Sequence, residues 1–166
     1  MTQSSNYKAS LLSCLLSLLT TPLWAAELSV TAPNIVPGAA APVQVNVRGD
    51  GRTSNIGVEL YFDETRLSLS PLRGVIEGAS RYEGVYCMRS ASNRVSIIRL
   101  SELDNPLPAQ ATLCELPFKT PRDAPNGSTS LLLEQAECYA KGQPSECRIG
   151  EVASQRVIAK VPFQPK

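Results

Sequence analysis

The sequence contains no histidine among its 166 residues. Histidine is the commonest general base and a member of the Ser-His-Asp and Cys-His catalytic arrangements, so neither arrangement can form. The sequence also lacks a Gly-x-Ser-x-Gly nucleophile turn and a glycine-rich phosphate loop. A carboxylate pair that meets only in the folded chain stays open, but scattered acidic residues are typical of a solvated surface. We therefore expect a protein that is not an enzyme and uses no cofactor and no metal.

Aromatic residues are scarce as well, at 5% of the chain. Trp24 is the only tryptophan, and the tyrosines after it are Tyr61, Tyr82, Tyr86 and Tyr139. They do not form the strip of planar rings on which polysaccharide-binding modules often stack sugars. Each tyrosine has two interpretations, cover for the edge of the core or a binding residue. Tyr61 and Tyr139 are the candidates for binding.

Neither sign of charge is in excess. Residues 1–25 hold one lysine and no acidic residue, so Lys+Arg falls from 16 to 15 against 15 Asp+Glu in the rest of the chain. A neutral chain has no general attraction to nucleic acid or to anionic lipid. We expect neither as a partner.

The N-terminal segment has the pattern of an export signal. Polar residues precede the apolar run LLSCLLSLLTTPLW, and small residues follow at Ala25 and Ala26. A membrane-spanning helix needs about 20 apolar residues, and Pro22 interrupts the run before that length. A lipoprotein anchor at Cys14 is disfavoured, because Leu11, Leu12 and Ser13 precede it and most of the apolar run follows it. The pattern predicts that residues 1–25 are removed and that residues 26–166 form one domain, exported to the periplasm or outside the cell, with no stable membrane insertion.

Four cysteines remain in the mature chain, and their even number predicts disulfides in an oxidising compartment. They are Cys87, Cys114, Cys138 and Cys147. A zinc site is disfavoured because histidine is missing and the cysteines are not clustered. Of the three possible pairings, we favour Cys87–Cys114 and Cys138–Cys147. The second would make the stretch CYAKGQPSEC a stapled loop.

Alternation of apolar and polar residues dominates the rest of the chain, as expected for strands with one buried face. In residues 42–47 the valines alternate, and in residues 55–63 the inward set is Ile56, Val58, Leu60 and Phe62. Further strands are predicted at residues 93–101, at residues 156–163, and at residues 111–119 with Thr112, Cys114, Leu116 and Phe118 inward. Residues 128–135 contain three consecutive leucines, so this strand is either buried on both faces or changes register.

Turn signals separate these runs, and no stretch of ten or more residues shows a helical apolar stripe. The Ala/Pro-rich segment 32–42 is expected to join the first two strands. Asp63 and Glu64 indicate a turn, not a calcium cage. Asn126 matches a glycosylation acceptor, but Asn-Gly also favours a tight turn, which we prefer. Short strands between turns predict an all-β fold, an antiparallel β-sandwich.

Several of these stretches resemble the cohesin family. NIGVELYFDETRLSL (55–69) is similar to the cohesin signature in which a strand ends in an aromatic-Asp pair, here Phe62-Asp63, followed by a leucine, here Leu67. ATLCELPFKTPRDAPNGSTSLLLE (111–134) resembles a later cohesin segment. The matching residues are Phe118, Ala124, Gly127 and Leu131. PGAAAPVQVNV (37–47) resembles the opening of the family, and NRVSIIRLS fits a strand between these segments.

The resemblance implies a jelly-roll type sandwich of about nine strands, related to carbohydrate-binding modules. Cohesins bind dockerin modules through one sheet face, with calcium held by the dockerin. On this chain the corresponding outward residues are Glu59 and Tyr61. The expected disulfides, and the lack of scaffold repeats and of a dockerin-type calcium loop, depart from the family.

These observations favour an exported, non-catalytic binding domain that recognises a dockerin-like or envelope protein through a sheet face or a loop. The first alternative is a polysaccharide-binding module that uses Tyr61 and Tyr139. The second is a structural component of an envelope or secretion assembly.

Overall fold

The computed structural model describes residues 25–123, 127–150 and 155–158. Residues 1–24 of the expected export signal, Cys14 among them, therefore lie outside the described residues. Ala124 and Asn126 lie outside them too. The described strands are β1 (Ala26–Thr31), β2 (Ala40–Arg48), β3 (Asn55–Phe62), β4 (Gly74–Val75), β5 (Val85–Ala91), β6 (Arg94–Arg99), β7 (Ala111–Lys119), β8 (Gly127–Ala140), β9 (Gln143–Ser145), β10 (Cys147–Ile149) and β11 (Gln155–Ile158).

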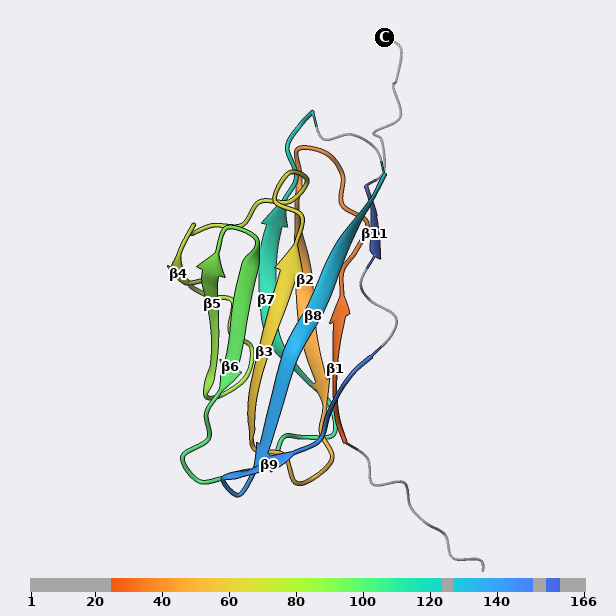
Figure 1. Cartoon of the computed structure of the whole chain (residues 1–166). Helices are drawn as coiled ribbons and strands as arrows, with labels where there is room; N and C mark the ends of the chain where they lie inside the picture. The colour runs from red at the N-terminus through yellow and green to blue at the C-terminus, as the bar shows by residue number, and fades with distance from the viewer. Residues whose placement is uncertain (1–24, 124–126, 151–154, 159–166) are drawn as a thin grey trace, which may run out of the picture.

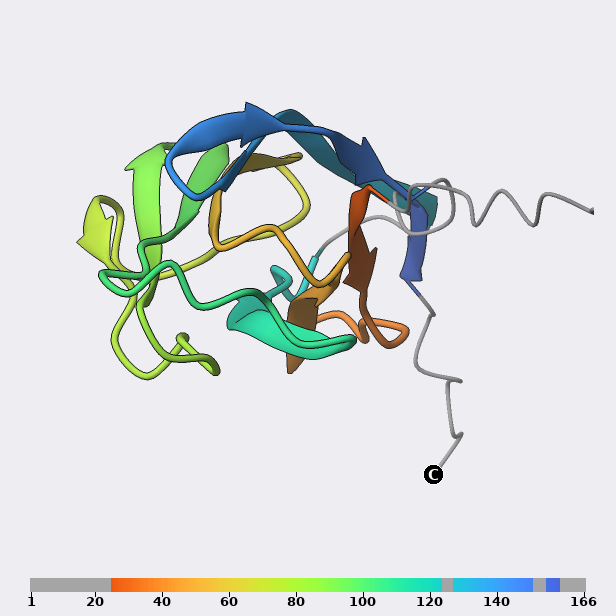
Figure 2. The same cartoon turned by 90° about the horizontal axis from the view of Figure 1, so that it is seen from below.

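Two sheets pack face to face, which confirms the predicted all-β sandwich (Figures 1 and 2). The smaller sheet has the order β10-β1-β2-β7. The larger has the order β11-β8-β3-β6-β5-β4, with β9 also paired to β8. The strand pairs are antiparallel except for β1 and β10, which run parallel with Ala26 beside Cys147. There are more strands than expected because short pieces, β4, β9, β10 and β11, lie at the sheet margins.

The described residues include no helix that is long and apolar enough to cross a membrane. The predicted strand at residues 156–163 is observed as β11 up to Ile158, and its remainder lies outside the described residues. As expected, residues 32–39 connect the first two strands, and β2 begins at Ala40.

The core lies between the sheets and is built by the alternating residues. The predicted inward side chains of β2 and β3 are all buried, and the rings of Phe62 and Phe118 meet edge to face at 4.9 Å. Burying one such apolar side chain stabilises a fold by about 1.5–3 kcal/mol. The alternation is therefore the main reason why these segments form strands here.

One inward assignment on β7 is wrong. Thr112 pairs with Asn46 on the outer face and donates a hydrogen bond to its Oδ1 at 2.8 Å, while Leu113 is fully buried. The cause is a β-bulge: Val45 pairs with Cys114 and Asn46 with Thr112, so Leu113 is an extra residue on β7. From Cys114 to Phe118 the predicted inward residues are buried as expected.

The leucine run of β8 is not buried on both faces. Leu131 and Leu133 are buried, whereas Leu132 is 43% exposed. A register shift follows, opposite the stretch Gly57 to Glu59 of β3, and Gln135 has a positive φ of 52°. The shift points both Glu134 and Gln135 outward and returns Cys138 to the core. This is the change of register that the sequence left as an alternative.

The cohesin-like motif around Asp63 is a strand end followed by a turn. Asp63 Oδ1 accepts hydrogen bonds from the backbone N–H and the hydroxyl of Thr65, and these bonds lower the pKa of Asp63. The Asp63 carbonyl accepts from the N–H of Leu67, whose side chain is fully buried. The motif thus directs the chain back onto the core, as the turn interpretation predicted.

Both disulfides follow the favoured pairing, and each joins one sheet to the other. Cys87 on β5 bonds Cys114 on β7, and Cys138 on β8 bonds Cys147 on β10. The expected stapled loop is wrong in one respect, because most of residues 138–147 is strand. Lys141 and Gly142, with φ of 50° and 70°, form a tight turn between β8 and β9.

Two arginines occupy inward positions where the alternation would expect apolar residues. Arg89 donates hydrogen bonds to the carbonyl groups of Leu69, Ala91 and Ser92. Arg99 donates to the carbonyl groups of Ser54 and Asn105 and lies over the Tyr82 ring. Each guanidinium therefore ties a connecting segment to its sheet.

Candidate interaction surface

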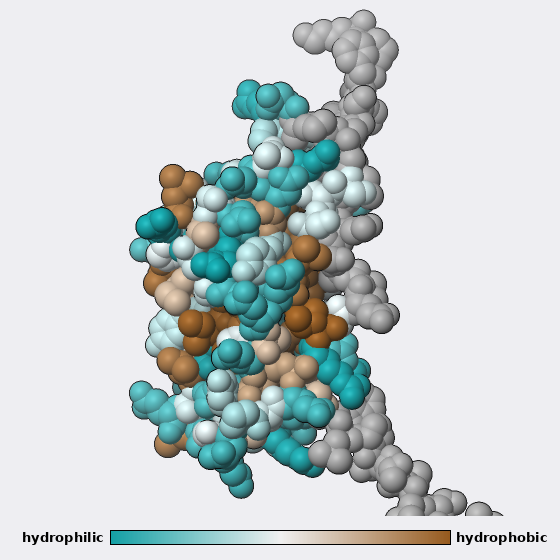
Figure 3. Space-filling model, in the orientation of Figure 1, coloured by the Kyte–Doolittle hydropathy of each residue, from teal (hydrophilic) through white to brown (hydrophobic). Residues whose placement is uncertain are grey.

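The predicted binding residues Glu59, Tyr61 and Tyr139 all belong to the larger sheet. Glu59 and Tyr61 alternate with buried Val58 and Leu60 on β3, and Tyr139 follows buried Cys138 on β8, so all three side chains face outward. We call the outward side chains of β8, β3, β6 and β5 the front face, which is turned to the viewer in Figures 1 and 3.

The structure does not bring the two candidate tyrosines together. Tyr139 pairs with Asn55 at one end of β3, and Tyr61 pairs with Leu132 near the other end. Six residues of strand separate these positions, about 20 Å at roughly 3.3 Å per residue. They share a face but not a site.

Strand register arranges the front face in three rows. The first row is Tyr86, Ile98, Gly57 and Glu137; the second is Met88, Ser96, Glu59 and Glu134; the third is Arg94, Tyr61 and Leu132. Figure 3 shows apolar patches on this face separated by polar side chains. The first row carries apolar side chains beside a position with no side chain at all.

Gly57 has no side chain in the first row, and we call the open space at this position the depression at Gly57. A Cβ atom built at this residue would meet nothing within 4 Å, and its φ is not in the left-handed region. Neither packing nor backbone conformation therefore requires glycine here. The effect of the glycine is to leave space between Ile98 and Glu137.

A hollow of about 350 Å³ adjoins the first row at Tyr86. Leu100 and Leu103 line it and are 60% and 80% exposed, and Tyr86 is 51% exposed. Glu83 and Glu102 also line the hollow. The first row and this hollow together form a partly apolar surface with acidic side chains at its margin.

The second and third rows are held by a network around Glu59. Ser96 donates a hydrogen bond to Glu59 Oε1 at 2.8 Å, and Arg94 Nε lies 3.0 Å from Oε2. Arg94 also lies over the Tyr61 ring, 6.0 Å from its centroid. A hydrogen bond with Tyr61, and then the charge of Glu59, raise the pKa of Arg94. This half of the face is fixed before any partner binds.

Tyr139 lies at the end of β8, just before the hairpin turn. Its hydroxyl donates a hydrogen bond to Glu137 Oε2 at 3.2 Å. The negative charge of Glu137, and then this hydrogen bond, raise the pKa of Tyr139. The hydroxyl of Tyr139 is therefore a neutral hydrogen-bonding group at ordinary pH.

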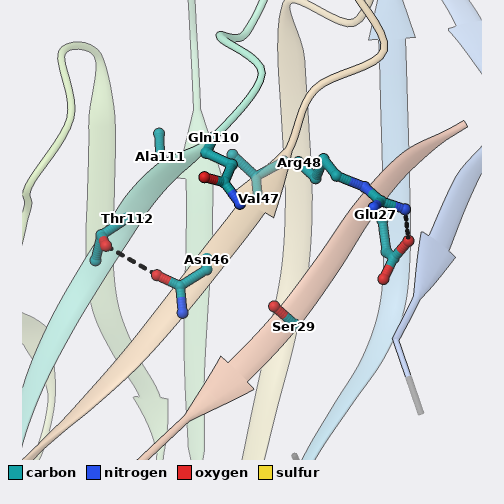
Figure 4. Close-up of a pocket in the computed structure, with 8 residues that line it drawn as sticks. All are labelled: Glu27, Ser29, Asn46, Val47, Arg48, Gln110, Ala111 and Thr112. Carbon is teal, nitrogen blue, oxygen red and sulfur yellow. Dashed lines mark hydrogen bonds and ion pairs between the residues drawn. The ribbon is translucent and has the colours of Figure 1, made fainter. Parts of the chain in front are cut away.

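The smaller sheet has a different outer surface, a polar hollow of about 600 Å³ across β1, β2 and β7 (Figure 4). Arg48 and Glu27 form an ion pair at 2.7 Å, and Asn46 bonds both Thr112 and Thr31. No aromatic residue lines this hollow. Its polar groups bond one another, as expected for a solvated sheet face.

Among residues 25–123, 127–150 and 155–158, no group of three or more histidine, cysteine, aspartate or glutamate side chains is placed to hold a metal ion. The front face contains no cluster of catalytic groups either, within the same residues. The arrangement offers a surface for contact.

The sequence did not single out Gly57, Tyr86, Ile98 or Leu132 as functional. Alternation alone places Tyr86 outward, opposite buried Cys87, so a search for apolar residues on the polar side of each strand would have found it. Ile98 follows Ile97, and only the pairing with β3 and β5 shows which of the two faces outward.

No protein-family model and no curated protein matches the sequence. Solved structures of cohesins do match. The solution structure of CaCohA2 from Clostridium acetobutylicum is 15% identical, with a TM-score of 0.63 over 85% of this chain and 94% of that one. A non-cellulosomal cohesin from the archaeon Archaeoglobus fulgidus is 12% identical, with a TM-score of 0.57 over 82% of this chain and 92% of its own.

A third match is a chain from a type I cohesin–dockerin complex of Clostridium thermocellum. It is 6% identical, with a TM-score of 0.66 over 83% of this chain and 96% of that chain. At these identities the likeness establishes the fold. The chain has the cohesin fold, as the resemblance around Phe62 and Asp63 implied.

Proposed function

We propose that the mature chain is an exported, non-catalytic module that binds a protein partner through its front face. The observation that carries the proposal is the contrast between the two sheets. The front face combines exposed Tyr86 and Leu132 with the open depression at Gly57. The hollow across β1, β2 and β7 of the smaller sheet has no aromatic lining and is mainly polar, and the exposed Ile149 of that sheet lies on its marginal strand β10. Specific protein interfaces are centred on apolar and aromatic side chains within a polar rim.

The cohesin fold supports this proposal, since one of the similar structures is a cohesin–dockerin complex. The partner is a dockerin-like or envelope protein, and any calcium belongs to the partner. Export to the periplasm or the cell exterior is supported by the two disulfides, because such bonds persist in oxidising compartments. Residues 1–25 supply the export signal in this proposal.

The test uses oxidised residues 26–166, immobilised and exposed to envelope and secreted fractions of the host in the presence of calcium. Gly57→Arg fills the depression with a long charged side chain at a position with free space. Ser29→Arg, an outward position on β1 of the smaller sheet, is the matched control. Circular dichroism and thermal melting check that both variants fold.

We expect the parent protein and Ser29→Arg to retain the same protein in stoichiometric amount, and Gly57→Arg to lose it. Retention of that protein by a folded Gly57→Arg would refute the front face as the binding surface. Release by a chelator would show that the interaction requires calcium, and calcium binding by the isolated partner would assign the ion to it.

Polysaccharide binding is the less favoured alternative. Tyr61 and Tyr139 are only partly exposed and lie far apart along β3 and β8, and the polar hollow of the smaller sheet has no aromatic lining. This alternative predicts that, if the parent protein is retained on a polysaccharide, Tyr61→Ala and Tyr139→Ala each abolish its retention. Unchanged retention in both would exclude these two residues as the site.

A further inference from the structure

We infer that the partner presents a basic surface with an apolar centre, and that it seats over the first row of the front face. This inference rests on the proposed function and specifies the chemistry of its partner. It follows from three features of the front face: where its carboxylates lie, how few of them are paired, and how far apart they are.

Acidic side chains are concentrated on and beside the front face, although the mature chain is neutral. The front face carries Glu59, Glu134 and Glu137, and the adjoining hollow adds Glu83 and Glu102. Arg94 is the basic residue of the three rows. Arg99 lines the hollow, where its guanidinium donates to the carbonyl groups of Ser54 and Asn105, so five carboxylates face two arginines. Since positive and negative side chains balance over the mature chain, the excess of negative charge here is matched by positive charge elsewhere.

Most of these carboxylates have no cationic partner within the described part of the chain. The ion pairs there join Glu27 to Arg48, Asp63 to Arg66, Glu115 to Arg81 and Glu59 to Arg94. Glu134, Glu137, Glu83 and Glu102 take part in none of them. Glu137 accepts only the hydrogen bond of a neutral tyrosine, and so keeps its charge available.

The apolar side chains lie between these carboxylates. Glu137 ends the first row on β8, and Tyr86 ends it on β5. Glu83 and Glu102 line the hollow next to Tyr86, past the paired ends of β5 and β6. Strands lie about 4.8 Å apart, so the four strands of the row span roughly 15 Å. Ile98 and the depression at Gly57 occupy the middle of that span.

A partner element of about that width can therefore place an apolar side chain in the depression and basic side chains at both margins. An α-helix with its side chains is about 10–12 Å across. Opposite charges at such margins chiefly raise the association rate and select the partner, and salt weakens both effects.

The test uses defined probes and residues 26–166 labelled with ¹⁵N. Two synthetic helical peptides of about 18 residues, roughly five turns, carry the same leucine stripe. One has lysines on both flanks of the stripe, and the other has glutamates there. Binding is followed by amide chemical shifts while the salt rises from about 0.01 M to about 1 M, which shortens the Debye length from about 30 Å to about 3 Å.

We expect the lysine peptide to bind, with the largest shifts at Gly57, Tyr86 and Ile98, and the glutamate peptide not to bind. Glu134→Lys/Glu137→Lys should lower the affinity for the lysine peptide at least tenfold at low salt. Glu64→Lys/Glu77→Lys makes the same change in net charge at exposed positions after β3 and β4, in none of the three rows, and should leave binding within twofold. Gly57→Arg should abolish it.

Three results would overturn the inference. They are equal binding of the two peptides, chemical-shift changes scattered over both sheets, and an equal loss of affinity in both charge-reversal variants. The same variants separate it from the proposed function in the capture experiment. If Gly57→Arg loses the host partner while Glu134→Lys/Glu137→Lys retains it fully at every salt concentration, the front face is correct and the basic partner is wrong. If a folded Gly57→Arg keeps the host partner, the proposed function itself fails.

Discussion

The two disulfides should contribute unequally to stability, and the difference follows from their positions in the chain. The Cys87–Cys114 bond spans 27 residues, and the Cys138–Cys147 bond spans 9. Restricting the unfolded chain over these spans stabilises the fold by about 3.5 and about 2.6 kcal/mol respectively, on the chain-entropy account. The first bond should therefore contribute more.

Burial increases this difference. Cys87 and Cys114 are 1% and 0% exposed, whereas Cys147 is only partly buried. Replacing a buried sulfur by hydrogen costs roughly 1 kcal/mol, similar to a buried methylene. We therefore expect Cys87→Ala/Cys114→Ala to lower the free energy of unfolding by about 5–6 kcal/mol, and Cys138→Ala/Cys147→Ala by about 3–4 kcal/mol.

Urea unfolding of residues 26–166 gives both values. Circular dichroism follows it, because these residues contain no tryptophan for fluorescence. The slope of free energy against urea should rise in each variant, because an unbridged unfolded chain exposes more surface. Since domains are typically stable by about 5–15 kcal/mol, the first variant should be close to unfolding in buffer. An equal or larger loss for Cys138→Ala/Cys147→Ala would refute the reasoning.

Two further predictions concern the turn at Asp50 and the bulge in β7. Burial raises the pKa of Asp50, but hydrogen bonds from Thr53 and Arg52 outweigh it and leave the pKa below its ordinary value. The contribution of the Asp50 carboxylate to stability should therefore be full above a pH of about 4, the unfolded pKa, and be lost as the pH falls through the lower folded pKa. Asp50→Ala should lower the free energy of unfolding by about 1 kcal/mol and flatten the acid side of a curve of stability against pH. An unchanged curve would show that Asp50 does not cause the loss of stability in acid. Leu113→Ala should cost about 2–5 kcal/mol in urea unfolding and Thr112→Ala less than about 1.5 kcal/mol, and the reverse order would show that the bulge is misplaced.

The strands of the core could be predicted because their inward positions are filled by one kind of residue. In β2 and β3 every inward residue is apolar, and from Gln44 onward every outward residue is polar, glycine or amphipathic, so the sequence alone determines the buried face. The pairing of the cysteines was also predicted, although the sequence could not show that each bond joins the two sheets.

The errors arise where pairing between distant strands decides the outcome. Whether Thr112 or Leu113 faces inward depends on the register of β7 against β2, which no local pattern encodes. The same holds for Leu132, which lies between two buried leucines on a strand whose register shifts against β3. Arg89 and Arg99 break the alternation because carbonyl groups of connecting segments bond their guanidinium groups, and these segments are close only in the folded chain.

The candidate site was predicted in part. The sequence placed Glu59 and Tyr61 outward on a strand, and the structure keeps them on the front face. The depression at Gly57 depends on what surrounds a missing side chain. Such a feature becomes visible only when β3, β6 and β8 are assembled.

The position of the Cys87–Cys114 bond determines what happens when a protease cuts the chain. The connection between β6 and β7 is exposed around Leu103, and exposed connections are the preferred sites of proteolytic cutting. Because that connection lies between the two cysteines in the chain, a cut within it leaves both products covalently joined. A nicked molecule would run as two bands only after reduction, and its two sheets would remain together around an intact core.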